Sequence, residues 1–385
     1  MFTPSQLEQM PIEIERIMSA VEQRIMEDII RRININDEIT RSADWQIYRL
    51  KMIGQSDEFI RKQIQTALKL SEAEIQRLYD KVIQSGYARD NSLYEAVGKP
   101  QIPFKDNEQL QQLIQSVIAQ TQTEMVNITQ SMGFAIDIGN RRIFTPMAEY
   151  YQQILDRAIM EVTTGEFDYN ATLRRTIHDM TKSGIRGVGY PTGHRNRIVV
   201  AARRALMTGI TQVVSHINDS NAQELDTEYF EVSWHGTARP SHQAWQGRVY
   251  SRQDLVSICG LGTGPGLMGW NCYHTYYPFI PGVSERTYTD AQLDKMNQKE
   301  NEIKTYNDKK YNRYEATQRQ RELETLMRKQ RQEIDLLKKG GATEDDLINA
   351  RAKYRSTMAQ YTNFSTKMDL PQQRERVYMD GLGRV

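Results

Sequence analysis

The chain has little cysteine, almost no net charge and no long hydrophobic run. Two cysteines among 385 residues exclude a disulfide framework and fit a reducing cytoplasm. Lys and Arg number 50 against 49 Asp and Glu, so no overall basic charge indicates nucleic-acid binding. The first residues lack the basic and apolar segments of a signal peptide, and no apolar run approaches the roughly 20 residues of a membrane span. We therefore expect a protein made in the cytoplasm that has no membrane partner.

Most of the chain shows helical periodicity. Residues 4–130 are expected to form one helix after another, because apolar side chains recur at helical spacing. Ser71 and Glu74 fit a capping box that starts a helix, with an apolar stripe after them (Ile75, Leu78, Tyr79, Val82), and Gly86 is expected to end it. Residues 98–104 are expected to form a linker between helical blocks.

A second helical block is expected over 145–218, and a third part of the chain is helical from Thr289 onwards. Thr289 and Gln292 fit a capping box for one long helix over 290–338. Gly340 and Gly341 are expected to break it, and Thr343 to start a return helix, which predicts an antiparallel helical hairpin.

Residues 228–286 change to strand and turn signals and hold three of the four Trp, both Cys and three of the six His. The predicted fold class is therefore mostly α, with an extended helical N-terminal part, a small central α+β module and a C-terminal antiparallel helical hairpin. The expected domains are an N-terminal helical region (1–100), a second helical region with a basic face (101–227), the α+β module (228–288), and the hairpin with its tail (289–385).

The basic face rests on a run of cations within 169–218, where Asp179 is the only acid. A helix starting near His194 is expected to place Arg195, Val199 and Arg203 on one face. This run predicts either an anion surface, for DNA phosphate or an acidic partner, or a solvated face balanced by acids from elsewhere. Its members are Arg174, Arg175, Lys182, Arg186, Arg195, Arg197, Arg203 and Arg204.

Two kinds of chemistry are conceivable in 231–286. His235, His242, Cys272 and His274 could hold a structural zinc ion, although their spacing is not a standard zinc pattern. The alternative is a packed polar core without metal. Cys272 could also act as a thiol nucleophile with His242 or His274 as its base, but no orienting residue or oxyanion donor is recognisable.

Two shorter motifs invite a functional interpretation. Residues 264–269 match the glycine fingerprint of dinucleotide sites, but no helix pattern follows, so we expect a flexible loop whose glycines allow positive φ. Pro240 restricts Arg239 to extended geometry, and Ser241 can cap the turn that follows. Arg239 is then either a rigid anchor for a carboxylate or phosphate, or a staple for its own module.

Residues 232–247, which read Val-Ser-Trp-His-Gly-Thr-Ala-Arg-Pro-Ser-His-Gln-Ala-Trp-Gln-Gly, are followed by Asn-Cys-Tyr-His at 271–274 and Pro-Phe-Ile-Pro-Gly at 278–282. This pattern resembles the tailed-phage minor capsid proteins, which are related to the Mu-type head-morphogenesis family. Tyr273 stands where that family usually has Arg. We take the motif core to be a structural or partner anchor, made of Trp234, His235, Arg239, Pro240, Ser241, His242, Trp245, Gln246, Asn271, Cys272 and His274.

The resemblance extends over nearly the whole chain, because the opening residues, 203–212, the charged hairpin and the ending near 374–377 also look like this family. It implies a structural protein without enzymatic activity, located in the capsid interior near the portal and aiding head assembly, DNA packaging or DNA ejection. The implied partners are the portal protein, capsid or scaffold proteins, and packaged double-stranded DNA. The alternative function is a thiol- or metal-dependent hydrolase in 231–286.

Overall fold

The computed structural model describes residues 3–39, 45–138, 141–164, 168–189, 195–383 and 385. The chain folds into two compact units. Unit 1 comprises residues 1–13, 72–124 and 203–319, and unit 2 comprises residues 14–71, 125–202 and 320–385. Each unit is assembled from three separated segments. The division into four consecutive domains stays a prediction about which parts fold on their own.

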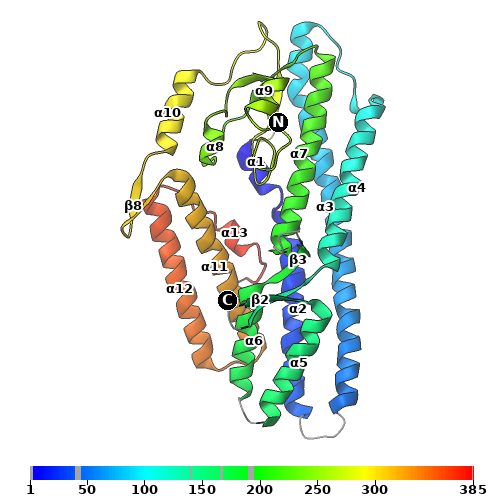
Figure 1. Ribbon diagram of the computed structural model, residues 1–385, viewed down its shortest axis with the longest axis vertical. Coiled ribbons are helices and arrows are strands. Elements are labelled where there is room, and N and C mark those ends of the chain that lie inside the picture. Colours follow the sequence, from blue (N-terminus) through cyan, green and yellow to red (C-terminus); the bar gives the residue numbers. More distant parts are fainter. Residues whose placement is uncertain (1–2, 40–44, 139–140, 165–167, 190–194, 384) are drawn as a thin grey trace. The chain divides into compact units, whose positions relative to one another are not determined.

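Unit 1 is built on the segments that it takes from three long helices, α3 (Trp45–Val97), α4 (Glu108–Gln130) and α7 (Ile198–Glu224), which lie side by side in Figure 1. Tyr79 of α3 shares a hydrogen bond of 2.7 Å with Thr121 of α4. Gly209 of α7 lies so close to the Tyr79 hydroxyl that a Cβ at this position would overlap it. The glycine therefore lets the three helices approach closely. A short helix, α1 (Pro4–Gln9), precedes them in the chain.

The expected helix boundaries at Ser71 and Gly86 are wrong, because α3 runs through both positions. Ser71 is buried inside the helix and caps nothing. Gly86 faces α7, where an added Cβ would lie 3.0 Å from Ile217. Contact with a neighbouring helix outweighs the cost of about 1 kcal/mol for glycine in a helix interior. The expected stripe over 75–82 is buried as predicted, and the linker is confirmed as non-helical chain up to the short 3-10 helix η1 (Phe104–Asp106).

The predicted α+β module is confirmed within unit 1. Its sheet has the order β6-β5-β7 and is antiparallel, with β5 (Tyr229–Val232) between β6 (Val249–Ser251) and β7 (Tyr276–Phe279). Two short helices, α8 (Pro240–Gln243) and α9 (Arg252–Ser257), connect the strands. Phe230, Trp245, Leu255 and Tyr276 are among the buried side chains that form its core.

The single helix expected over 290–338 is wrong. The Thr289 capping box is confirmed and starts α10 (Asp290–Glu300), but a hairpin of β8 (Lys304–Tyr306) and β9 (Lys309–Tyr311) then intervenes. The turn residues Asn307 and Asp308 both adopt positive φ, at 48° and 62°. Asn and Asp tolerate this conformation, which two-residue hairpin turns require, so these residues favour the hairpin over a continuous helix.

Unit 2 contains a four-stranded antiparallel sheet that the sequence analysis missed. Its order is β2-β1-β3-β4, formed by β1 (Gly133–Ile138), β2 (Arg141–Pro146), β3 (Ile185–Gly189) and β4 (Arg195–Arg197). The helical block expected over 145–218 is therefore wrong in part, since α5 (Met147–Thr164) and α6 (Tyr169–Ser183) are followed by strands. Phe134 of β1 packs on Tyr150 of α5, with ring centroids 4.2 Å apart.

The rest of unit 2 confirms the predicted hairpin. From Gln320 onwards, α11 (Arg313–Lys339) belongs to this unit; it ends at Gly340, and α12 (Glu344–Lys367) begins after its N-cap Thr343. Hydrogen bonds from Gln320 to Ser365 and from Gln330 to Thr357 show that the two helices run antiparallel, as Figure 1 also displays. The unit also includes most of α2 (Ile12–Ile39) and the short α13 (Glu375–Tyr378) of the tail.

Among the described helices, α7 is long and apolar enough to cross a membrane by length and composition alone. This differs from the expectation that no apolar run approaches that length. Half of its apolar window is buried inside the protein, and core helices meet the same criterion. The expectation that the protein has no membrane partner stays a prediction.

Candidate functional site

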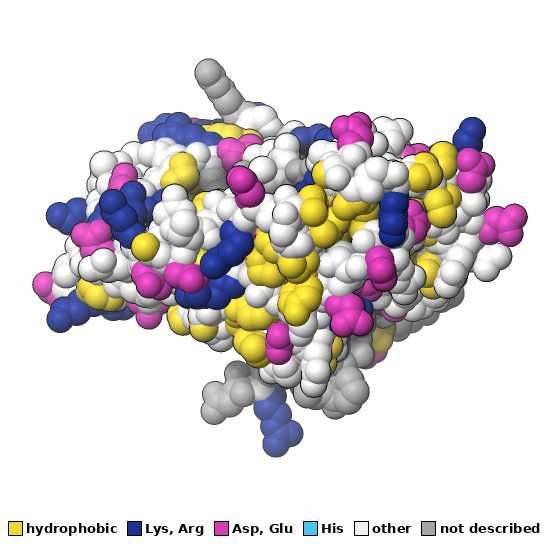
Figure 2. Space-filling model, turned by 90° about the horizontal axis from the view of Figure 1, so that it is seen from above, with side chains coloured by type: hydrophobic (Ala, Val, Ile, Leu, Met, Phe, Trp, Pro, Cys, Tyr) yellow, Lys and Arg dark blue, Asp and Glu magenta, His cyan; other side chains and the backbone are white. Residues whose placement is uncertain are grey.

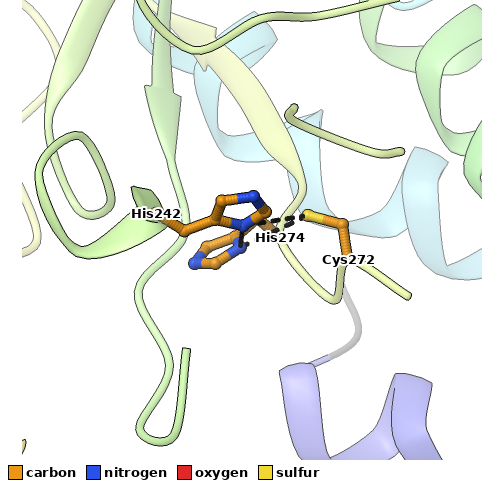
Figure 3. Close-up of side chains that lie close together, drawn as sticks. All are labelled: His242, Cys272 and His274. Carbon is orange, nitrogen blue, oxygen red and sulfur yellow. Dashed lines mark hydrogen bonds between the residues drawn. The ribbon is translucent and has the colours of Figure 1, made fainter. Parts of the chain in front are cut away.

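Three of the predicted site residues converge inside the α+β module. Pro240 occupies the first turn of α8, and Arg239 before it is extended, with φ −61° and ψ 148°. This start places His242 on α8, where it faces Cys272 and His274 from the segment that leads into β7 (Figure 3). Their exposed fractions are only 2%, 4% and 0%. The module thus encloses a cluster of two imidazoles and one thiol.

The three side chains present one atom each to a common centre. His242 Nδ1 and His274 Nδ1 are 3.4 Å apart. Cys272 Sγ lies 3.8 Å from His242 Nδ1 and 3.4 Å from His274 Nδ1. Together they form a group of metal-ligating residues, all of them buried. We call these three residues the His-Cys cluster.

The outer nitrogen of each imidazole is fixed by an oxygen acceptor. His242 Nε2 lies 2.8 Å from the Pro265 carbonyl oxygen, and His274 Nε2 lies 2.8 Å from Gln246 Oε1. The backbone N–H of His235 also donates to Gln246 Oε1, which confirms that this amide atom is the oxygen. A carbonyl oxygen only accepts, so both Nε2 atoms carry a hydrogen and both Nδ1 atoms carry a lone pair.

Burial keeps all three groups of the His-Cys cluster uncharged in the absence of an ion. Desolvation lowers the pKa of His242 to about 4 and also lowers the pKa of His274. It raises the pKa of the Cys272 thiol above its ordinary value. A thiolate and imidazolium pair, which a cysteine nucleophile requires, is therefore disfavoured here.

The predicted set of four zinc ligands included His235, but His235 lies outside the His-Cys cluster. Its ring stacks against His274 with centroids 4.2 Å apart, and its Nδ1 lies 2.7 Å from the Gly236 carbonyl oxygen. On the other side, Trp245 is buried and packs on both cluster imidazoles, at 4.5 Å from His242 and 4.8 Å from His274. Aromatic rings thus pack directly against both imidazoles of the cluster.

The glycine-rich loop owes its composition to close backbone packing. A Cβ at Gly266 would lie 2.1 Å from the Gly260 carbonyl oxygen, and one at Gly269 would lie 2.2 Å from that of Gly264. The expectation that these fingerprint glycines allow positive φ is wrong, since Gly264, Gly266 and Gly269 are not among the positive-φ glycines. The loop folds back on itself and presents the Pro265 carbonyl to His242. A backbone acceptor of this kind has no side-chain signal in the sequence.

Arg239 acts inside the module, as the staple alternative anticipated. It donates a hydrogen bond of 2.6 Å to the Trp270 carbonyl oxygen and so joins the start of α8 to the segment before Cys272. The side chains of Ser241, Trp270 and Asn271 are exposed, and Asn271 adopts a φ of 52°. Whether the motif core also anchors a partner stays a prediction.

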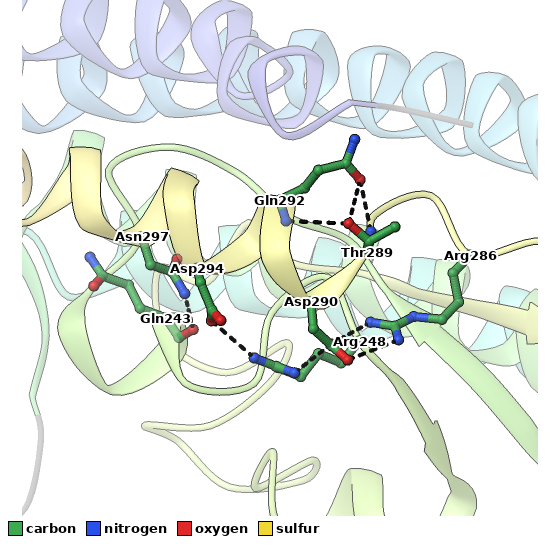
Figure 4. A network of polar contacts seen from close by, with 8 residues as sticks. All are labelled: Gln243, Arg248, Arg286, Thr289, Asp290, Gln292, Asp294 and Asn297. Atoms are coloured by element: carbon green, nitrogen blue, oxygen red, sulfur yellow. Dashed lines mark hydrogen bonds and ion pairs between the residues drawn. The ribbon is translucent and has the colours of Figure 1, made fainter.

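Helix α10 is tied to the same module by polar contacts (Figure 4). Asn297 donates to the backbone carbonyl of Gln243, the residue directly after His242, at 3.1 Å. Asp290, at the start of α10, accepts from Arg248 at 2.7 Å and from Arg286 at 2.8 Å. Asp290 also lies at the positive end of the helix dipole. These contacts make 228–300 one connected region.

The predicted basic run does not form one face on one element. Arg174 and Arg175 lie on α6, Arg195 lies on β4, and α7 begins only at Ile198, so the expected shared helix of Arg195 and Arg203 is wrong. Six of the eight cations belong to unit 2, and Arg203 and Arg204 belong to unit 1.

Several of these cations have partners within their own unit. In unit 2, Arg174 pairs with Asp346 and Lys182 with Asp137, each at 2.9 Å. Arg186 donates to the Arg195 carbonyl at 2.8 Å, Arg197 to the Thr181 carbonyl at 2.8 Å, and Arg195 lies over the Phe144 ring. In unit 1, Arg203 donates to the Tyr273 hydroxyl. These contacts fit the balanced alternative better than a continuous anion surface.

Comparison with known proteins identifies the family. A curated protein described as a structural protein, from Lactococcus phage LL-H, is 23% identical over 273 residues, which cover 65% of this chain and 71% of the relative. No solved structure matches the chain. The family model described as phage minor capsid protein 2 matches residues 2–365. The match covers most of both units, including the His-Cys cluster, and the chain belongs to the phage minor capsid protein 2 family.

Proposed function

We propose that this protein is a structural component of the phage head, located in the capsid interior beside the portal, where it aids head assembly. Its partners would be the portal protein and the capsid or scaffold proteins. The observation that carries the proposal is the family match over residues 2–365, since it includes the whole α+β module. A similar phage protein described as structural supports the same conclusion.

The geometry of the module supports assembly rather than catalysis. Arg239, His242 and Gln246, which could serve a substrate, are instead bonded to the module's own backbone or side chains. The buried, neutral Cys272 thiol counts against the thiol-hydrolase alternative. A pocket beside Cys272 and Arg203 has a volume of about 30 Å³, enough for a few water molecules but not for a metabolite.

Exposed apolar side chains support a protein partner. Trp270 has 62% of its surface exposed while Arg239 holds its backbone in place. On the face seen from above in Figure 2, hydrophobic side chains gather near the middle, with charged side chains around them. Exposed tryptophan and clustered apolar surface are typical of protein–protein contacts. Other exposed apolar residues of unit 1 include Ile102, Leu113, Tyr229, Val256, Ile258, Val283 and Ile303.

The proposal also includes two more specific roles, which are contact with packaged DNA and ejection together with the DNA. The internal partners of Arg174, Lys182, Arg186 and Arg197 count against a continuous DNA-binding face. A double variant, Arg203→Glu with Arg204→Glu, tests the two cations of the run that lie on α7. Unchanged DNA binding and portal association of this variant would show that these cations bind neither DNA nor the portal protein.

The proposal as a whole is tested by quantitative mass spectrometry of purified virions, before and after triggered DNA release, combined with chemical cross-linking. We expect a few copies in each particle and cross-links to the portal protein. Retention after release supports a docked assembly role, and loss supports ejection. Complete absence from virions would contradict the structural assignment.

A further inference from the structure

The His-Cys cluster has a hydrogen-bonding deficit that its own atoms cannot remove. Both Nε2 atoms donate to oxygen acceptors, so both Nδ1 atoms point lone pairs at each other across 3.4 Å. The Cys272 thiol has one hydrogen and can donate it to only one of them. One buried acceptor is then left facing another, which costs about 1–3 kcal/mol in a dry interior. A cation at the centre would satisfy all three atoms at once.

The dimensions of the cluster fit a tetrahedral zinc ion. Zinc binds imidazole nitrogen at about 2.0–2.1 Å and thiolate sulfur at about 2.3 Å. A tetrahedron with those bond lengths has edges of about 3.3 Å between two nitrogens and about 3.6 Å between nitrogen and sulfur. The observed edges are 3.4 Å for the nitrogen pair, and 3.4 Å and 3.8 Å for the two nitrogen–sulfur pairs. Little rearrangement is needed to seat the ion.

The surroundings also match those of a metal centre. Metal-bound histidines usually donate their second ring N–H to a carbonyl or carboxylate, which fixes the tautomer and the ring orientation. His242 does so to Pro265, and His274 does so to Gln246. Trp245 packs on both imidazoles, while the small pocket beside Cys272 has room for the water molecule that a fourth coordination position would take. Nitrogen and sulfur ligands together favour zinc over magnesium or calcium, which prefer oxygen.

We propose that His242 Nδ1, His274 Nδ1 and Cys272 Sγ bind one Zn²⁺ ion that fastens α8 to the segment before β7. On binding, the thiol loses its proton to solvent and its sulfur forms the metal bond. Within the described residues no other His, Cys, Asp or Glu joins this group, so a water molecule would complete the tetrahedron. The ion closes a loop between residues 242 and 272 that contains the glycine-rich segment. This proposal does not depend on where the protein lies in the virion.

Metal binding to the purified full chain tests the proposal. The protein is stripped with a chelator and titrated with Zn²⁺ against a chromophoric competitor, and then with Co²⁺ as a spectroscopic substitute. We expect one Zn²⁺ per chain, and with Co²⁺ a thiolate-to-metal charge-transfer band together with the visible absorption of a tetrahedral centre. A folded wild-type chain that binds neither ion would overturn the proposal.

Variants identify the ligands. Cys272→Ser should abolish the charge-transfer band. His274→Gln should weaken Zn²⁺ binding by at least the 10–100-fold that is typical when a hydrogen-bond partner of a metal ligand is removed. Cys259→Ser is the matched control, because Cys259 is an equally buried thiol of the same module outside the cluster. Should a ligand variant fail to fold, Gln246→Leu leaves all three ligands in place and should still weaken binding about 10–100-fold. A band that survives Cys272→Ser, or that disappears with Cys259→Ser, would contradict the assignment.

Discussion

A buried ion pair of unit 2 and the His-Cys cluster of unit 1 compensate their polar atoms in opposite ways. In unit 2, Arg331 forms two hydrogen bonds to the oppositely charged Asp380, at 2.7 Å and 3.0 Å, with side chains only 2% and 8% exposed. In the module, His242, Cys272 and His274 are neutral and face one another without a compensating charge.

The difference shows what each region needs in order to fold. A buried ion pair carries its own compensation, so the pair of Arg331 and Asp380 needs no added ion. A cluster of facing lone pairs does not, and an electropositive atom at its centre would remove a cost of about 1–3 kcal/mol. The comparison therefore predicts that unit 2 depends on its charge partners and that the module depends on an ion.

Breaking the buried pair of unit 2 should have the largest effect. Asp380→Ala leaves the Arg331 guanidinium buried and without its carboxylate, and we expect a loss of about 3–5 kcal/mol in the free energy of unfolding. Chemical denaturation measures it. Glu375→Ala, an exposed acid of the same tail, is the control and should change little. A loss below about 1 kcal/mol for Asp380→Ala would mean that the tail does not stabilise unit 2.

Metal addition should act on the other region alone. Free Zn²⁺ at 100 times its dissociation constant should raise the free energy of unfolding of unit 1 by about 2.7 kcal/mol, because only the folded cluster binds the ion. Hydrogen exchange resolved by residue should show the added protection around α8 and residues 269–275, with none on the α11–α12 hairpin. Equal protection of both units, or protection that persists in Cys272→Ser, would contradict a Zn²⁺ site confined to the His-Cys cluster.

A glycine substitution tests whether the loop supports the cluster. Gly266→Ala places a Cβ against the Gly260 carbonyl and should cost about 1–3 kcal/mol through overpacking, while displacing the Pro265 carbonyl from His242. Zn²⁺ affinity should therefore fall together with stability. Gly54→Ala is the contrasting change: Gly54 lies inside α3 with open space around it, so alanine should stabilise the helix by up to about 1 kcal/mol. Normal Zn²⁺ affinity in Gly266→Ala would show that the loop does not support the ligands of the His-Cys cluster.

The smallest effect expected is that of a helix cap in unit 2. The Thr343 hydroxyl accepts from the Asp346 N–H and donates to its carboxylate, which together with Arg174 lowers the pKa of Asp346. Thr343→Ala should cost about 1 kcal/mol at neutral pH. A carboxyl with a lowered pKa stabilises the fold above its unfolded pKa near 4, and this contribution is lost as the pH falls through the folded value. Denaturation at pH 7 and pH 3 should therefore show a smaller cost in acid, and a constant cost would contradict the role of Asp346.

Local signals in the sequence predicted the elements that depend on local chemistry. The Thr289 and Thr343 caps and the break at Gly340 act within one turn of chain, and all three are confirmed. The helix end predicted at Gly86 was wrong because this glycine packs against Ile217 of α7, a residue more than 100 positions away in the chain. The sheet of unit 2 was missed because its short strands alternate with strongly helical segments.

The site was predictable in its residues but not in its geometry. His242, Cys272 and His274 were recognisable as ligand types in a segment rich in Trp and Gly. The sequence could not show that His235 turns to the Gly236 carbonyl, nor that Gln246 and Pro265 fix both tautomers. Those features depend on how a backbone carbonyl and a side-chain amide are oriented after folding.

X-ray absorption at the zinc edge of the loaded full-length protein identifies the atoms bound to the proposed ion. We expect one sulfur at about 2.3 Å, light ligands at about 2.0–2.1 Å, and the more distant scattering of two imidazole rings. Cys272→Ser should lose the sulfur and Cys259→Ser should keep it. A first shell without sulfur in the wild-type protein would show that the cluster holds no zinc ion.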